Sequence, residues 1–199
     1  MSKDFNTALK ERRTRYAISK ETTISDAKIE KLIKEAVKYT PSSFNAQSSR
    51  VIVLFGESHN KLWDITKETL KKIVPEDQFT STEEKINSFK NGYGTVLFFE
   101  DNSVIKSLQK QFELYKDNFP VWSQQSSGML QYVVWTSLET QGLGASLQHY
   151  NPIIDNDVKD NWRIPQNWSL IAQMPFGTPT APPDKKQFQP IEERVKIFR

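Results

Sequence analysis

Cysteine is absent from the 199-residue sequence, and histidine occurs only twice, at His59 and His149. Without cysteine the chain can form no disulfide, thiol nucleophile, iron–sulfur cluster or cysteine-bound zinc site. Two histidines so far apart in the sequence also argue against a zinc site or a two-histidine catalytic centre. Magnesium held by carboxylates is the metal site that this composition still allows. We expect no resident metal.

Long apolar runs are missing as well. The longest, Val51–Phe55 and Val96–Phe99, are far shorter than the ~20 residues that span a bilayer. The first residues are charged and lack the apolar stretch of a signal peptide. We therefore expect a cytoplasmic protein that does not act at a membrane. The length favours one domain, residues 1–199.

Glycine is scarce, with seven residues. No G-x-G-x-x-G, P-loop, G-x-S-x-G or H-E-x-x-H pattern occurs, so the main sequence support for a Rossmann, kinase, hydrolase or metalloprotease function is lacking. The absent motifs leave the charge distribution and the polar loops as the informative features.

Positive charge is concentrated at the two ends of the chain. Residues 1–20 carry six basic and two acidic side chains, and residues 181–199 carry five and three. Because the whole chain has a formal charge of +3, the middle carries −3. This distribution favours a local anion site over the broad basic face of a nucleic-acid binder, although a small nucleic-acid-binding domain that uses the terminal arginines remains an alternative.

Apolar periodicity indicates an α+β fold. Helices are predicted at 3–13, 26–39, 59–73, 83–90, 103–116 and from Pro120 to Gly142, and strands at 50–55, 93–100 and 168–174. The stretch Ala145–Pro152 should be short and irregular. Residues 175–190 hold five of the ten prolines, so we expect residues 175–199 to form an extended C-terminal arm that stays out of the sheet.

Three polar segments are candidates for a binding site. Three arginines, Arg12, Arg13 and Arg15, stand at the end of the first helix. Their forked donors suit a phosphate, although a solvated helix end would look the same. The loop 41–49 offers hydroxyl and amide groups for a planar heterocycle, or is an ordinary turn. The segment 142–152 follows a helix stop and should expose unpaired backbone amides, or simply connects a helix to a strand.

Aromatic residues make up 12% of the chain, and most should lie in the core. Phe44 and Trp122 are candidates to stack on a flat ligand. His149 taken alone is more often a structural histidine than a catalytic one.

Four motifs in a fixed order carry a family resemblance over nearly the whole chain. They are ALKERRTRYAIS, PSSFNAQSSRVIVL, QGLGASLQHYNP and PDKKQFQPIEERVKIF. Together they resemble the FMN-dependent nitroreductases, and most of all the branch that includes the fatty-acid-repression-mutant-like proteins and small bacterial enzymes. The resemblance implies helices around a central antiparallel sheet and an intertwined homodimer with exchanged C-terminal arms. It also implies two FMN molecules at the dimer interface, where neither subunit forms a complete site alone.

The resemblance assigns the cofactor-binding residues in three groups. Arg12, Arg13 and Thr14 match the motif that holds the FMN phosphate, and Lys186 and Arg194 add positive charge there. A loop from the other subunit contacts the flavin through Ser42, Ser43, Asn45 and Gln47. A third segment, with Leu147, Gln148 and His149, lies against the isoalloxazine and offers a backbone N–H near its N5.

Two positions depart from the pattern of the wider family. Tyr16 stands where many members have a basic residue, so Arg15 is expected to stabilise the flavin's pyrimidine edge instead. Ser48 and Ser49 replace a common Pro-Trp pair.

The resemblance implies that FMN carries a hydride from NADH or NADPH to a nitroaromatic or quinone-type acceptor. Because the flavin does the chemistry, no protein acid or nucleophile is required, in agreement with the lack of any catalytic dyad. A non-catalytic flavin-binding or regulatory protein is the alternative.

Overall fold

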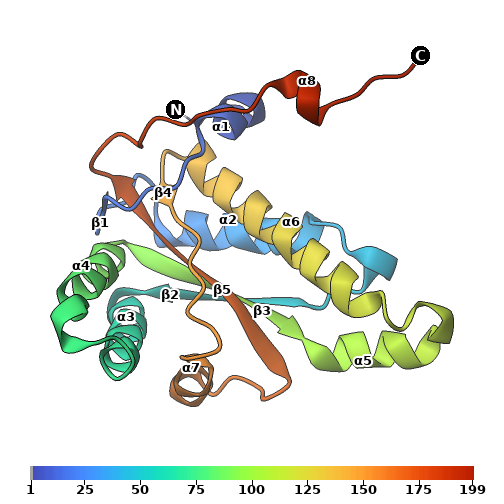
Figure 1. The fold of residues 1–199 in the computed structure, drawn as a ribbon, viewed down its shortest axis with the longest axis horizontal. Helices are drawn as coiled ribbons and strands as arrows, with labels where there is room; N and C mark the ends of the chain where they lie inside the picture. Colours follow the sequence, from blue (N-terminus) through green and yellow to red (C-terminus); the bar gives the residue numbers. More distant parts are fainter. Residues whose placement is uncertain (1) are drawn as a thin grey trace.

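Helices pack on both faces of an antiparallel sheet (Figure 1) in the computed structural model, which describes residues 2–199. This arrangement confirms the predicted α+β fold class. The helices are α1 (Phe5–Glu11), α2 (Asp26–Tyr39), α3 (Gly56–Lys71), α4 (Phe79–Lys90), α5 (Asn102–Gln111), α6 (Phe119–Thr140), α7 (Asp155–Trp162) and α8 (Ile191–Arg194). Short 3-10 turns lie at η1 (Ser43–Asn45), η2 (Glu76–Gln78) and η3 (Glu113–Tyr115).

One sheet contains the five strands found in residues 2–199. They are β1 (Ile18–Ser19), β2 (Ser49–Phe55), β3 (Gly94–Asp101), β4 (Gly144–Ala145) and β5 (Trp168–Pro179). The order is β1-β5-β3-β2, β4 also pairs with β5, and every pairing is antiparallel. Strand β3 is buried along its whole length, whereas β2 is an edge of the sheet.

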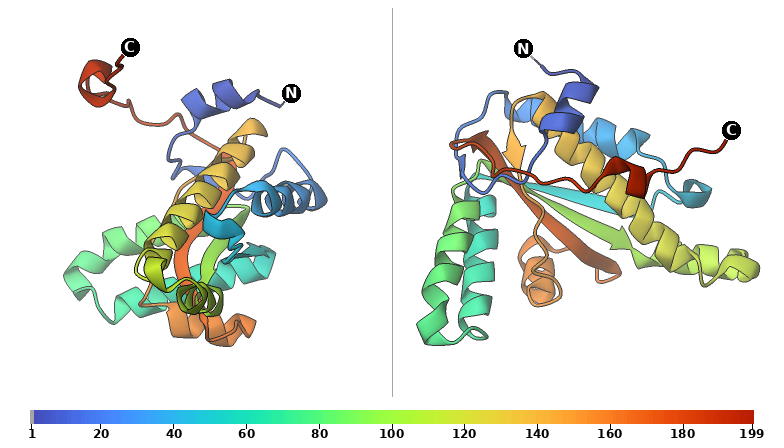
Figure 2. Two further views of the ribbon diagram at one scale, coloured as in Figure 1. Left: turned by 90° about the vertical axis from the view of Figure 1, so that its right-hand side faces the viewer. Right: turned by 45° about the horizontal axis from the view of Figure 1, so that its top comes forward.

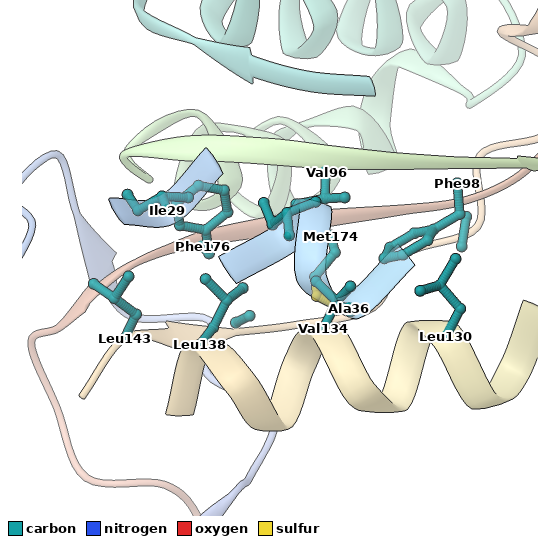
Figure 3. Packing of buried hydrophobic residues seen from close by; sticks show 13 residues of the cluster. Ile29, Ala36, Val96, Phe98, Leu130, Val134, Leu138, Leu143, Met174 and Phe176 are labelled. Atoms are coloured by element: carbon teal, nitrogen blue, oxygen red, sulfur yellow. The ribbon is translucent and has the colours of Figure 1, made fainter. Parts of the chain in front are cut away.

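Side chains of the central strands alternate between two cores, as the period of a β-strand requires. Val96 and Phe98 point to the face covered by α2 and α6, where they pack with Leu130, Val134 and other apolar residues (Figure 3). Neighbouring residues of β3 point to the opposite face, which α3, α4 and α7 cover. Each helix layer thus buries one face of the same sheet.

A β-bulge lets β5 serve both cores. The pairing shifts between Phe98 and Phe99, so that Phe98 lies opposite Ala172 while Phe99 lies opposite Leu170. The extra residue on β5 moves Leu170 to the second core, although Ala172 belongs to the first.

The expectation that the proline-rich segment stays out of the sheet is wrong at its start. Strand β5 does not end at Met174 but continues to Pro179, and the buried Pro175 lies opposite Thr95 of β3. The carbonyl of Pro175 accepts a hydrogen bond from the Ser146 backbone N–H at 3.2 Å. The N–H and C=O of one strand residue point towards the same neighbouring strand. The position of the missing N–H of Pro175 therefore faces the side of β4, and the proline interrupts no hydrogen bond to β3.

Residues 180–199 form the observed C-terminal arm. The arm passes α1 and then runs away from the body of the molecule (Figure 2). Its apolar side chains are exposed, and Phe198 keeps 91% of its surface.

Several elements differ from the prediction in extent. Helix α2 has the predicted bounds, whereas α3 and α4 begin earlier and α5 ends earlier than expected. Helix α7 was not predicted, although Ile154, Val158 and Trp162 recur at helical spacing and pack into the second core. No helix within residues 2–199 has both the length and the apolar character needed to cross a membrane.

Candidate functional site

The arginine segment, Arg12–Arg15, follows α1 and runs beside β4. Helix α1 ends at Glu11, because Arg12 already has a non-helical ψ of 118°. Thr14 then forms a parallel bridge with Ala145, and the Arg15 N–H donates to the Ala145 carbonyl at 2.9 Å. The arginines therefore lie in an extended segment fixed to the sheet, and not in the predicted last helical turn.

The guanidinium groups of this segment have no carboxylate partner. Arg13 Nη2 donates to the Asp184 carbonyl at 2.5 Å and Arg15 Nη1 to the Ala181 carbonyl at 3.1 Å. The Arg12 guanidinium lies 4.5 Å from the ring centre of Trp135. Within residues 2–199 none of these three forms an ion pair, and the buried Nε atoms of Arg12 and Arg15 donate no hydrogen bond. Three adjacent cations without an anion fit an external phosphate.

A partly buried ion-pair network anchors α1 and so positions the arginine segment. Lys3 Nζ lies 2.5 Å from the Glu139 carboxylate of α6 and 2.8 Å from that of Glu11. Burial lowers the pKa of Lys3, but the hydrogen bonds and charges of both carboxylates outweigh it, so that the pKa is raised. The Lys3 N–H also donates to the Thr140 carbonyl. Helix α1 is thereby tied to the C-terminal end of α6.

The first residues of the C-terminal arm meet the arginine segment through the two carbonyl contacts of Arg13 and Arg15. Lys186 follows Asp184 closely and is exposed, with its Nζ 5.2 Å from the ring centre of Phe188. Arg194 is exposed in α8 and forms no hydrogen bond or ion pair with the arginine segment. The basic ends of the chain thus meet at residues 181–184, while Arg194 lies farther along the arm.

The contact segment, Leu147–His149, runs beside β5 with alternating hydrogen bonds. Gln148 exchanges two backbone hydrogen bonds with Gln173, at 2.7 and 2.9 Å. The N–H groups of Leu147 and His149 donate none within the described chain, residues 2–199. The expectation of unpaired amides is therefore correct for Leu147 and His149 and wrong for Gln148, because a chain beside a strand pairs every second residue.

The polar loop, Ser42–Gln47, has a backbone conformation that is unusual for its residues. Phe44, Asn45 and Gln47 have φ values of 55°, 51° and 49°. A left-handed conformation costs a residue other than glycine roughly 1–2 kcal/mol. Such strain is typical of functional sites when the surrounding structure holds it in place. The exposed side chains of Asn45 and Gln47 are available to a ligand.

An aromatic cluster holds one side of the polar loop. The ring of Phe44 stacks on Trp122 at 5.7 Å and 18° and also packs against Phe112, Tyr115 and Phe119. Phe44 nevertheless remains 49% exposed. The two aromatic residues singled out in the sequence therefore contact each other at the corner between α5 and α6.

A second set of contacts, absent from the predicted site, holds the other side of the loop. Ser48 Oγ and Ser49 Oγ donate to the two carboxylate oxygens of Glu100 at 2.6 and 2.5 Å. Arg50 donates to the Gln47 carbonyl at 2.7 Å and pairs with Asp101 at 2.9 Å. We call the contact of Glu100 with Ser48 and Ser49 the Glu100 clamp.

Electrostatics differ between the two neighbouring carboxylates. Burial raises the pKa of Glu100, and the hydrogen bonds from Ser48 and Ser49 offset this only in part. Burial also raises the pKa of Asp101, but the hydrogen bonds from Ser103 and Asn167, with the charge of Arg50, lower it overall. The only sequence signal for this network was a pair of carboxylates at the end of a buried strand.

A single chain does not bring the predicted site together. The arginine segment lies at the β4 end of α6, whereas the polar loop lies at the opposite end of that helix, near α5 (Figures 1 and 2). Ser42 and Gln47 instead border a groove of about 480 Å³ between α2, β2 and α6.

Comparisons with known proteins agree with the motifs. The model of the Nitroreductase family matches residues 9–178. HBN1 of Saccharomyces cerevisiae is 36% identical over 191 residues, which cover 94% of this chain and 93% of HBN1.

Solved structures share the fold. Nitroreductase CinD from Lactococcus lactis in complex with nicotinic acid has a TM-score of 0.92 and 43% identity, and the match covers 98% of this chain and all of CinD. CinD has also been solved with chloramphenicol and with 4-nitrophenol. A more distant protein of the same fold, from Desulfovibrio desulfuricans in complex with FMN, is 18% identical with a TM-score of 0.69, and both chains are covered completely.

The family match spans most of the chain, and CinD shares its fold and 43% of its sequence. The chain therefore belongs to the nitroreductase family, whose members are oxidoreductases.

Proposed function

We propose that this protein is an FMN-dependent oxidoreductase that transfers a hydride from NADH or NADPH to small nitroaromatic or quinone-type acceptors. The observation that carries the proposal is the arginine segment, with three guanidinium groups and no carboxylate partner within the described residues. CinD complexes with 4-nitrophenol and chloramphenicol support aromatic acceptors, and the FMN complex of the Desulfovibrio protein supports the cofactor.

The cofactor fits the donor set at the arginine segment. Arg12, Arg13 and Thr14 would hold the phosphate, and Lys186 and Arg194 would add positive charge through the C-terminal arm. Forked guanidinium donors bind phosphate in bidentate geometry, and the arginine segment supplies such donors without a carboxylate partner. FMN bound there would supply two-electron chemistry that the side chains of this protein lack.

Other residues would orient the ring and its surroundings. The free backbone N–H groups of Leu147 and His149 are available to a ring placed along the contact segment, with Gln148 fixed between them. Arg15 would place positive charge near the ring edge, which stabilises negative charge that develops on reduction. Ser42, Ser43, Asn45 and Gln47 would contact the ring from a second chain.

A homodimer is part of this proposal, because the polar loop lies far from the arginine segment in one chain. Two features support it. Strand β2 is a sheet edge that no other strand within residues 2–199 covers, and the C-terminal arm exposes Phe188, Ile197 and Phe198 by 76–91%. Exposed apolar side chains and open strand edges are typical of surfaces that a partner covers. We propose one domain per chain, with the two arms exchanged.

Absorbance spectroscopy tests the proposal. Purified protein should carry a flavin, and anaerobic NADH or NADPH should bleach it. Addition of 4-nitrophenol, chloramphenicol or a quinone should restore the colour in stopped-flow measurements. Colourless protein that takes up no FMN would refute the cofactor, whereas bound flavin that neither nicotinamide reduces would favour the non-catalytic alternative.

The proposed role of Arg15 has its own test. Arg15→Ala should slow flavin reduction more than it weakens FMN binding, because the charge acts on the reduced ring. Unchanged reduction kinetics would remove Arg15 from this role.

A further inference from the structure

The polar loop cannot hold its conformation by its own sequence. Three residues other than glycine, Phe44, Asn45 and Gln47, have positive φ, in a region that asparagine tolerates but phenylalanine and glutamine rarely adopt. Within the loop, the Gln47 N–H donates to Ser42 Oγ at 2.9 Å and the Asn45 N–H to the Ser42 carbonyl at 3.0 Å. Asn45 and Gln47 are exposed, so water competes for these bonds. The strained backbone therefore needs support from outside the loop.

The Glu100 clamp supplies this support where the loop joins β2. Glu100 is 1% exposed, and each of its carboxylate oxygens accepts a hydroxyl hydrogen bond. Ser48 and Ser49 are consecutive, and consecutive side chains of a regular strand point to opposite faces. Because both hydroxyls reach one carboxylate, the chain must turn at this point. The Asp101 N–H also donates to the Ser48 carbonyl at 2.9 Å.

We infer that Glu100 is a positioning residue, which holds the polar loop in the shape that meets the flavin. This inference rests on the proposed function. Glu100 itself is buried, so it acts through Ser48 and Ser49 on Gln47 and Asn45.

The variants distinguish the effect of hydrogen-bond geometry from the effect of charge and from a general loss of stability. Glu100→Gln keeps the length and two hydrogen-bonding atoms, and a hydroxyl can rotate to accept from the new amide. Glu100→Ala leaves the buried Ser48 hydroxyl and the partly buried Ser49 hydroxyl without a partner. Val158→Ala is the matched control, because Val158 is fully buried in α7, far from the loop, and its truncation should lower stability without changing the loop. The double variant Ser48→Ala/Ser49→Ala replaces Glu100→Ala if that protein fails to fold.

The first measurement needs no cofactor. Hydrogen–deuterium exchange of the FMN-free protein measures the exchange rate of the Gln47 amide. Ser42 protects this amide only while the loop keeps its shape. We expect at least about tenfold faster exchange at Gln47 in Glu100→Ala, and near-native exchange in Glu100→Gln and in Val158→Ala. Native-like exchange in Glu100→Ala would overturn the inference.

The second measurement uses FMN itself. The dissociation constant for FMN should rise at least about tenfold in Glu100→Ala, and the visible circular dichroism of the bound flavin should change. In Glu100→Gln both should stay close to those of the wild-type protein. Wild-type affinity and spectrum in Glu100→Ala would overturn the inference even if the protein were less stable. Failure of the wild-type protein to bind FMN would instead refute the proposed function, and with it the flavin half of the inference.

Discussion

The arginine segment and the polar loop both present polar groups at the surface, but they are built in opposite ways. The arginine segment has a relaxed extended backbone and cations that the protein leaves without carboxylate partners. The polar loop has a strained backbone and polar neighbours that are bonded to one another. Unpaired charge attracts a ligand, whereas a fixed network gives a surface its shape. The first region is therefore suited to binding an anion and the second to contacting a planar ring.

Removing a charge from the arginine segment should have the largest effect on cofactor binding. Arg12→Ala should weaken FMN binding about 10- to 100-fold, because the loss of one charge-assisted hydrogen-bond partner costs roughly 1.5–3 kcal/mol. Lys186→Ala should act in the same direction. Fluorescence titration with FMN measures both. Lys10→Ala, an exposed residue on α1, is the control, and a wild-type affinity in Arg12→Ala would refute the phosphate assignment.

A buried histidine lies outside both regions, so its titration should change the stability of the protein and not the binding of FMN. Burial lowers the pKa of His59 from 6.5 to about 4. The unfolded chain therefore binds more protons between these values, so that the stability is complete above pH 6.5 and falls as the pH decreases towards 4. We expect the free energy of unfolding to decrease by about 2 kcal/mol from pH 7.5 to pH 5, measured by urea denaturation.

The two histidines allow a matched comparison. His59→Gln should remove most of this pH dependence, whereas His149→Gln, at an exposed position, should keep it. A pH dependence that follows His149 instead would contradict the assignment.

The anchor of α1 should matter less than the arginines themselves. Lys3→Ala leaves Glu139, which is 3% exposed, without its partner from the segment that precedes α1. Because Lys3 is partly exposed, we expect a loss of about 1–2 kcal/mol in the free energy of unfolding, together with weaker FMN binding. Lys34→Ala removes an exposed pair with Glu30 and should change neither quantity measurably. Unaltered FMN affinity in Lys3→Ala would show that the segment needs no anchor.

Relief of backbone strain should have the smallest effect on stability, and it should distinguish two variants clearly by their FMN binding. Gln47→Gly and Arg163→Gly each place glycine at a positive φ, of 49° and 50°, and both should raise the free energy of unfolding by about 0.5–1 kcal/mol. Only Gln47→Gly should also weaken FMN binding, because Arg163 caps α7 outside the site. Thermal unfolding and FMN titration of the pair decide the point. Equal FMN affinity in both variants would remove Gln47 from the site.

Local sequence patterns predicted the arginine segment far better than the polar loop. The bounds of α2 follow from its apolar spacing and Pro41, and the arginine segment is visible as a run of charge. Helix α7, eight residues long, was missed although Ile154, Val158 and Trp162 recur at helical spacing. The extension of β5 through Pro175 depends on which neighbour its backbone faces, and the sequence alone does not specify that.

The polar loop shows the physical limit of sequence reasoning. Ser42, Asn45 and Gln47 could be identified from a family motif, but the left-handed backbone of Phe44 could not. The Glu100 clamp joins residues about fifty positions apart, and it exists only because β2 and β3 pair in one register. Charges of the arginine segment are local in the sequence, whereas the shape of the loop is a tertiary property.

If the arginine segment and the polar loop complete one flavin site across two chains, then two defective chains should complement each other. An Arg12→Ala/Arg13→Ala chain and an Asn45→Ala/Gln47→Ala chain should each bind FMN poorly. Co-expressed chains that pair at random should regain about a quarter of the sites, because each mixed dimer contains one site with an intact arginine segment and an intact loop. Restored flavin at that level supports a flavin site shared between two chains, and mixed dimers that bind no FMN would contradict such a site.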